Sequence, residues 1–172
     1  MTRGALLPLM GSVVLLLGSS VAWGGQYDEK ERAELARALK GAKVSLKQGI
    51  VASASNGKPI SGKFEVEDGK LQLSVYTAKG GKFSEVLVDP KSGRVAKVEA
   101  IEGGEDLTAA KAQADAMAKA KTALGAAVDA AVKKNPGFRP VGVIPALKDG
   151  HPVADVTLIK GDELKTASER LD

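Results

Sequence analysis

The sequence predicts an α+β fold made of two repeated units, each with one helix followed by an antiparallel meander of three to four strands. The first observation is repetition: residues 42–46 (AKVSL) return as residues 120–124 (AKTAL). Two turn-like dipeptides are also repeated: Asp68-Gly69 returns as Asp149-Gly150, and Lys79-Gly80 returns as Lys160-Gly161. Both lie at the same distance from their first copies, a few residues more than the distance between the two AK segments. The second observation is that the apolar period changes from helical to two after each of the repeated segments. A near-constant shift of this kind is typical of an internal duplication with a short insertion.

Residues 1–24 are predicted to be a secretory signal peptide. Arg3 supplies a positive charge, residues 5–17 are mostly apolar, and Ala22 and Gly24 are small residues placed for cleavage after Gly24. Cleavage after Ala22 is an alternative. The apolar run is shorter than the about 20 residues that a membrane-spanning helix needs. The chain has no cysteine, so it has no lipobox cysteine for lipid attachment. We therefore expect a periplasmic or secreted protein with no membrane span after signal cleavage.

The first unit, residues 25–103, is expected to open with a helix. Asp28 followed by Glu31 has the spacing of a capping box, and Asn56-Gly57 is a typical helix end. Between them, apolar residues occur at spacings of three and four, which places them on one helical face: Leu35, Leu39, Ala42, Leu46, Ile50 and Ala54. Gly49 and other glycines in this pattern indicate either kinks or close contact with a sheet.

The rest of the first unit is expected to form strands. The candidate strands are residues 62–67, 71–78, 83–89 and 94–101. Asp68-Gly69 and Gly80-Gly81 are predicted hairpin turns, because these residues accept a positive φ angle. Leu73 and Val75 alternate with polar neighbours and with Tyr76, a pattern that predicts a sheet with one buried face and one solvated face.

The second unit, residues 104–172, is expected to repeat this order. Its helix is predicted to begin near Asp106 or Thr108 and to end at Asn135-Pro136-Gly137. Three strand candidates follow, at residues 141–147, 153–160 and 163–171. The two units either form separate small cores or pack together around a shared one; the pattern of apolar residues is compatible with both arrangements.

This order of helix, strands and turns resembles the PepSY domain family. The resemblance is carried by residues 62–95, GKFEVEDGKLQLSVYTAKGGKFSEVLVDPKSGRV, and by residues 135–172, NPGFRPVGVIPALKDGHPVADVTLIKGDELKTASERLD. The motif consists of turn glycines and alternating apolar residues. The resemblance implies a secreted or periplasmic, non-catalytic module that restrains or modulates peptidases. In propeptides such units precede a peptidase domain, and this sequence shows none, so regulation is expected to act in trans.

The composition argues against an enzyme. A zinc peptidase signature needs two histidines on one helical face, and the chain has only His151, which follows a predicted turn. Asp68, Asp89 and Asp149 each stand beside Gly or Pro, where Asp commonly bonds the backbone of a turn. Neither an EF-hand spacing nor a phosphate loop occurs. Catalytic, cofactor and metal sites are therefore not expected.

The remaining hypotheses are all binding functions. A net charge of +4 and 3% aromatic residues give no clustered basic and aromatic surface of the kind that binds nucleic acid. The leading hypothesis is contact with a protein partner, a secreted or periplasmic peptidase, with Tyr76 and Phe138 as candidate contact residues. For Tyr76 the alternative is packing at the sheet rim, and for Phe138 it is a contact between helix and strand. Binding of a small ligand or ion between the units, and a structural role in an envelope assembly, are the other two hypotheses.

Overall fold

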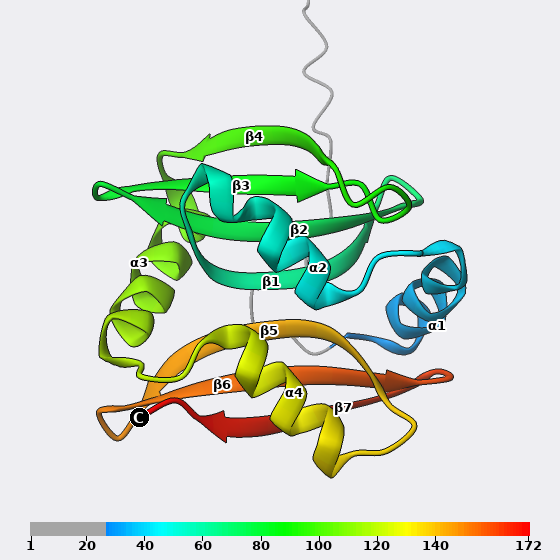
Figure 1. Ribbon diagram of the computed structural model, residues 1–172. Helices are drawn as coiled ribbons and strands as arrows, with labels where there is room; N and C mark the ends of the chain where they lie inside the picture. The colour runs from blue at the N-terminus through cyan, green and yellow to red at the C-terminus, as the bar shows by residue number, and fades with distance from the viewer. Residues whose placement is uncertain (1–26) are drawn as a thin grey trace, which may run out of the picture.

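The computed structural model describes residues 27–172 and places them in an α+β fold, in which helices pack against one antiparallel sheet (Figure 1). The predicted signal peptide, residues 1–24, lies outside the described residues. The helices are α1 (Glu29–Ala38), α2 (Leu46–Ser53), α3 (Gly104–Lys119) and α4 (Leu124–Lys134), with short 3-10 turns η1 (Leu39–Gly41) and η2 (Ala54–Asn56). The strands are β1 (Lys58–Glu67), β2 (Lys70–Lys79), β3 (Lys82–Val88), β4 (Val95–Ile101), β5 (Arg139–Lys148), β6 (His151–Lys160) and β7 (Glu163–Arg170).

All the predicted strands are present, and they form a single sheet in the order β4-β3-β2-β1-β5-β6-β7. Strands β5, β6 and β7 follow β1, β2 and β3 at one constant sequence interval, and α4 follows α2 at a slightly shorter one. Within the sheet the two meanders pair at β1 and β5, through Gly62 with Val143 and Lys63 with Gly142. The central junction of the sheet is thus much shorter than the hairpin pairings on either side of it.

The prediction of one continuous helix in front of each meander is wrong, because the chain breaks within both helical segments. The breaks lie at residues 42–45 and 120–123. At the first, Ser45 begins α2 with a capping box: its Oγ accepts from the Gln48 N–H, and the Gln48 side chain accepts from the Ser45 N–H at 2.8 Å. The Pro90 carbonyl accepts two backbone N–H groups of the first break. Each half of the chain therefore contains two helices, which pack against different parts of the sheet.

Helices α2 and α4 lie side by side on one face of the sheet, linked by an ion pair of 2.6 Å between Lys47 and Asp129 (Figure 1). Helices α1 and α3 lie instead at opposite ends of the strands, as Figure 1 shows. Gly49 of α2 approaches β2 so closely that a Cβ atom placed on it would lie 2.0 Å from Leu73 Cδ2. This glycine marks close contact with the sheet, one of the two roles expected for the glycines of this helix.

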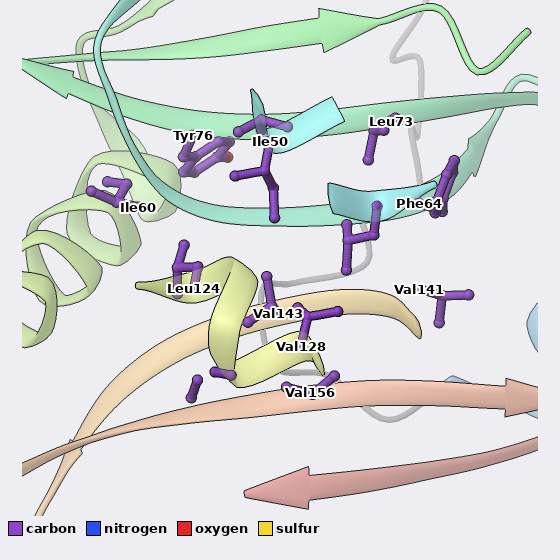
Figure 2. Packing of buried hydrophobic residues seen from close by; sticks show 14 of the residues in the cluster. Ile50, Ile60, Phe64, Leu73, Tyr76, Leu124, Val128, Val141, Val143 and Val156 are labelled. Carbon is purple, nitrogen blue, oxygen red and sulfur yellow. The ribbon is translucent and has the colours of Figure 1, made fainter. Parts of the chain in front are cut away.

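The two halves share one hydrophobic core. Of the two arrangements compatible with the sequence, separate small cores or a shared one, the structure has the shared core. Figure 2 shows buried residues of β1 and β2 above those of α4, β5 and β6 in one continuous layer. The largest fully buried side chains come from both halves: Phe64, Leu35, Leu46, Ile60, Leu73, Leu158, Leu171, Val75, Val86, Val88, Val128 and Val141. The protein is therefore expected to fold as one unit.

The predicted turn residues are confirmed. Asp68 and Asp149 have positive φ angles of 49° and 52°, and each is followed by a glycine that also has positive φ. This is the backbone that a two-residue hairpin of type I′ requires. The Asp89 carboxylate accepts from the backbone N–H groups of Ser92 and Lys91, and these hydrogen bonds, that of Ser92 above all, lower the pKa of Asp89. All three aspartates lie in turns, and Asp89 also bonds the turn backbone through its side chain.

Candidate functional site

A pocket of about 590 Å³ lies between α1 and the far end of the second meander. Its walls carry four cationic side chains, Arg37 and Lys40 from the first half, and Arg139 and Lys160 from the second. Asp162 is the single carboxylate among the lining residues. In Figure 1 this is the side of the molecule where α1 lies near the chain from α4 to β5 and the turn between β6 and β7. The pocket thus joins residues that are far apart in sequence.

Arg139 is the most firmly held of the four cations. Its guanidinium donates to the Leu39 carbonyl at 3.0 Å and to the Val44 carbonyl at 3.4 Å. It also lies 5.6 Å from the centroid of the Phe64 ring. Burial lowers the pKa of Arg139, although a guanidinium stays protonated at any physiological pH. The positive charge at this position is therefore permanent and positioned before any ligand arrives.

The floor of the pocket is apolar. Leu39 and Ile159 are 4% and 5% exposed, and the Ala33 and Ala36 side chains complete this surface. Lys160 stands at the rim, with its ammonium 5.8 Å from the centroid of the Phe138 ring. Binding pockets combine an apolar lining with a few convergent polar groups in this way.

Neither of the two contact residues predicted from the sequence, Phe138 and Tyr76, lines the pocket. Phe138 is partly buried against the core, and the ammonium groups of Lys160 and Lys165 lie above its ring. It lies just before β5, and the two lysines above its ring come from β6 and β7. Tyr76 is only 2% exposed, so the solvated position is wrong and the alternative, a packed position on the sheet, fits the structure.

The burial of Tyr76 results from α3, which covers one end of the second face of the sheet. Gly62 faces Ile50 of α2, so the neighbouring Ser61 side chain points to the opposite face. On that face Ser61 donates to the Gln113 side chain at 2.6 Å, and Tyr76 donates to the Asp106 carboxylate at 2.8 Å. These hydrogen bonds fix α3 on the sheet and leave the tyrosine inaccessible to a partner.

A second accessible surface is the edge strand β4. Nearly all of its residues are exposed, and Ile101 is half-buried. Within residues 27–172, four large hydrophobic side chains are exposed, and two of these, Val95 and Val98, lie on this strand. The opposite edge strand, β7, carries mostly charged and hydroxyl side chains at its exposed positions. The two free edges of the sheet therefore differ in chemistry.

His151 is the only histidine in the sequence. His151 is exposed and pairs with Asp172 at 2.7 Å, beside the turn where the sequence placed it. Among residues 27–172 no three or more His, Cys, Asp or Glu side chains gather as a metal site would require. In the same residues no helix has the length and apolarity needed to cross a bilayer.

Tyr27 provides a pH-dependent prediction. Burial raises the pKa of its phenol to about 12, and the nearby carboxylates of Glu65 and Glu31 add to this shift. Because the unfolded-state pKa is about 10, the protonated phenol stabilises the fold fully below that pH. This stabilisation is lost as the pH rises through about 12. We expect Glu65→Gln to lower the Tyr27 pKa, measured by phenolate absorbance in a Tyr76→Phe background. An unchanged titration would remove Glu65 as a cause.

Comparisons with protein-family models, with curated proteins and with solved structures each gave no match for this chain. The pocket and the two sheet edges must therefore be interpreted from their own chemistry.

Proposed function

We propose that the chain is an exported, non-catalytic binding protein of PepSY type that modulates a peptidase in trans. In this proposal the protein arose by duplication of a helix-and-meander unit. The equal sequence interval between the three pairs of corresponding strands supports that origin, as does the similar interval between α2 and α4. Each unit contains two helices where the sequence pattern suggested one.

The observation that carries the proposal is the exposed edge of β4. An edge strand leaves a row of backbone N–H and C=O groups without a partner strand. An extended peptide can add to such an edge, with backbone hydrogen bonds giving affinity and alternate side chains giving specificity. Val95 and Val98, which are 37% and 46% exposed, offer apolar contacts to an added strand. On the same strand an ion pair of 2.8 Å between Lys97 and Glu99 adds a polar contact point.

An extended segment of a peptidase is the occupant that we propose for this edge. A flexible segment of a peptidase can adopt the extended conformation that pairing with β4 requires. The exposed edge of β4 supports an extended occupant, and the family resemblance is the reason for proposing a peptidase as its source. Modulation would follow from immobilising that segment, without any reaction catalysed by this chain.

The test combines complex formation with peptidase activity. The mature protein is mixed with each purified peptidase secreted by the same cell, and binding and hydrolysis of a fluorogenic peptide are measured. We expect Val98→Lys to weaken binding at least tenfold, since an added charge on β4 opposes pairing with another strand. Val98 is well exposed, so this change is expected to leave the melting temperature nearly unchanged.

Thr166→Lys is the matched control, because it places the same charge on the other edge strand, β7, at an exposed position. It is expected to bind like the unaltered protein. Equal binding by both variants would remove β4 as the contact surface, and the absence of any peptidase that binds or changes its activity would remove the peptidase role.

A further inference from the structure

We propose that the pocket between α1 and the second meander binds a small organic anion, of the di- or tricarboxylate or phosphate-ester class. The inference goes beyond the proposed function, since it concerns a different surface and a different type of ligand. It rests on the charge of the pocket, on its apolar floor and on the way in which Arg139 is held.

The charge of the pocket is strongly unbalanced. Four cationic side chains and one carboxylate line it, and none of the four cations forms an ion pair within residues 27–172. Elsewhere in this part of the chain lysines do pair, as Lys47 does with Asp129. Four cations with a single carboxylate among them repel one another, and an anion between them relieves that repulsion. The arrangement favours a ligand with more than one negative charge.

Arg139 determines where the anion binds. Its hydrogen bonds to the Leu39 and Val44 carbonyls use two of its five N–H donors and fix the plane of the guanidinium. The remaining donors are available to a carboxylate or phosphate, both of which a guanidinium binds through paired hydrogen bonds. Because the side chain is already ordered, binding requires little further loss of conformational entropy.

The volume of the pocket and its apolar floor indicate the size of the ligand and the nature of its uncharged part. About 590 Å³ is in the range of pockets that hold small organic molecules. Leu39 and Ile159 offer an apolar surface to a short carbon skeleton, while Lys40 from the first half and Lys160 from the second provide charge. An inorganic ion would leave the apolar floor uncovered, and this favours an organic anion. A nucleic acid is disfavoured because the residues that line the pocket include no aromatic side chain for base stacking.

The first experiment uses citrate as the probe, with the mature protein and with sodium chloride added to equal ionic strength as the reference. Calorimetric titration and backbone amide NMR are the two readouts. We expect saturable citrate binding, with the largest amide shifts at Gly137, Gly161 and Arg139, which lie in the pocket wall. Sodium chloride is expected to produce neither saturation nor localised shifts.

Variants then assign the binding to the pocket. Arg37→Gln and Lys160→Gln alter exposed side chains, so both variants should fold, and we expect each to raise the citrate Kd about tenfold. Lys82→Gln removes the same charge at an exposed position at the start of β3 and is expected to change the Kd less than twofold. The variant Arg139→Lys keeps the charge and loses the fixed guanidinium plane, and its citrate Kd should also rise.

Three results would overturn the proposal. Citrate binding could be absent, or Lys82→Gln could weaken it as much as the two pocket variants do. Binding of a short glutamate peptide that is as tight as that of citrate, and equally sensitive to Arg37→Gln, would assign the pocket to acidic protein segments instead. These measurements involve no peptidase, so their failure would not contradict the proposed peptidase role, and failure of the peptidase test would not contradict anion binding.

Discussion

Replacing Gly49 with alanine is expected to destabilise the protein by about 1–3 kcal/mol, the usual cost of overpacking a core. Alanine is the better helix former by about 1 kcal/mol, so helix propensity alone predicts the opposite sign. Packing is expected to win because the new Cβ would lie 2.0 Å from Cδ2 and 2.8 Å from Cγ of Leu73. Leu73 is fully buried, which leaves its side chain little room to move. Urea unfolding followed by circular dichroism measures the difference.

Gly125→Ala is the matched control on helix α4. A Cβ atom on Gly125 would meet only the end of the Lys47 side chain, at an ordinary contact distance of 3.6 Å. We expect this change to be neutral or to stabilise the protein by up to about 1 kcal/mol. In a Leu73→Ala background, Gly49→Ala should cost less stability than it does in the unaltered protein, since the smaller side chain makes room for the new methyl group. A Gly49→Ala variant that is more stable than the unaltered protein would contradict the packing argument.

Phe64→Ala is expected to cost about 3–5 kcal/mol, a large part of the roughly 5–15 kcal/mol that stabilises a typical domain. Phe64 is fully buried, and its ring lies beneath the guanidinium of Arg139 from the second half of the chain. The substitution removes apolar contacts from the shared core and also removes the surface on which Arg139 rests. We expect a large fall in the urea midpoint and one cooperative transition for all probes, because the halves share a core.

Phe83→Ala provides the comparison for this prediction. Phe83 lies on β3 and is only partly buried, so the same truncation is expected to cost clearly less. Equal losses for the two variants would mean that burial is not the cause of the effect. Two separate unfolding transitions in Phe64→Ala would contradict the view that the halves fold as one unit.

Local features were well predicted by the sequence. The capping box of Asp28 and Glu31 is present, and the aspartate–glycine turns have the expected positive φ angles. The strands lie where the alternation of apolar residues placed them, within a few positions at each end. These features depend on neighbouring residues and therefore leave a direct trace in the sequence.

The break between α1 and α2 was missed, although a sign of it is present. Ser45 and Gln48 have the spacing of a second capping box inside the apparent helix, and the structure shows that they begin α2. The apolar stripe continued across the break because both helices face the same core. Periodicity alone cannot separate one long helix from two shorter ones that pack on related surfaces.

Tyr76 and the pocket depend on contacts between distant segments. Alternation along β2 predicted a solvated position for Tyr76, but α3, which carries its hydrogen-bond partner Asp106, covers it. The pocket combines Arg37 with Arg139 and Lys160, which no spacing in the sequence relates. Single lysines and arginines scattered over a nearly neutral chain gave no hint that four of them meet.

The short pairing between β1 and β5 has a consequence for how the chain can be divided. Two residue pairs join the meanders in the sheet, and the chain passes from one half to the other near Gly103 and Gly104, both exposed. Cutting there would sever no strand or helix interior. Each fragment would expose its share of the common core and the inner edge of its central strand, and those surfaces fit each other. Two fragments divided at this point are therefore expected to reassociate without the peptide bond between them, as in fragment complementation.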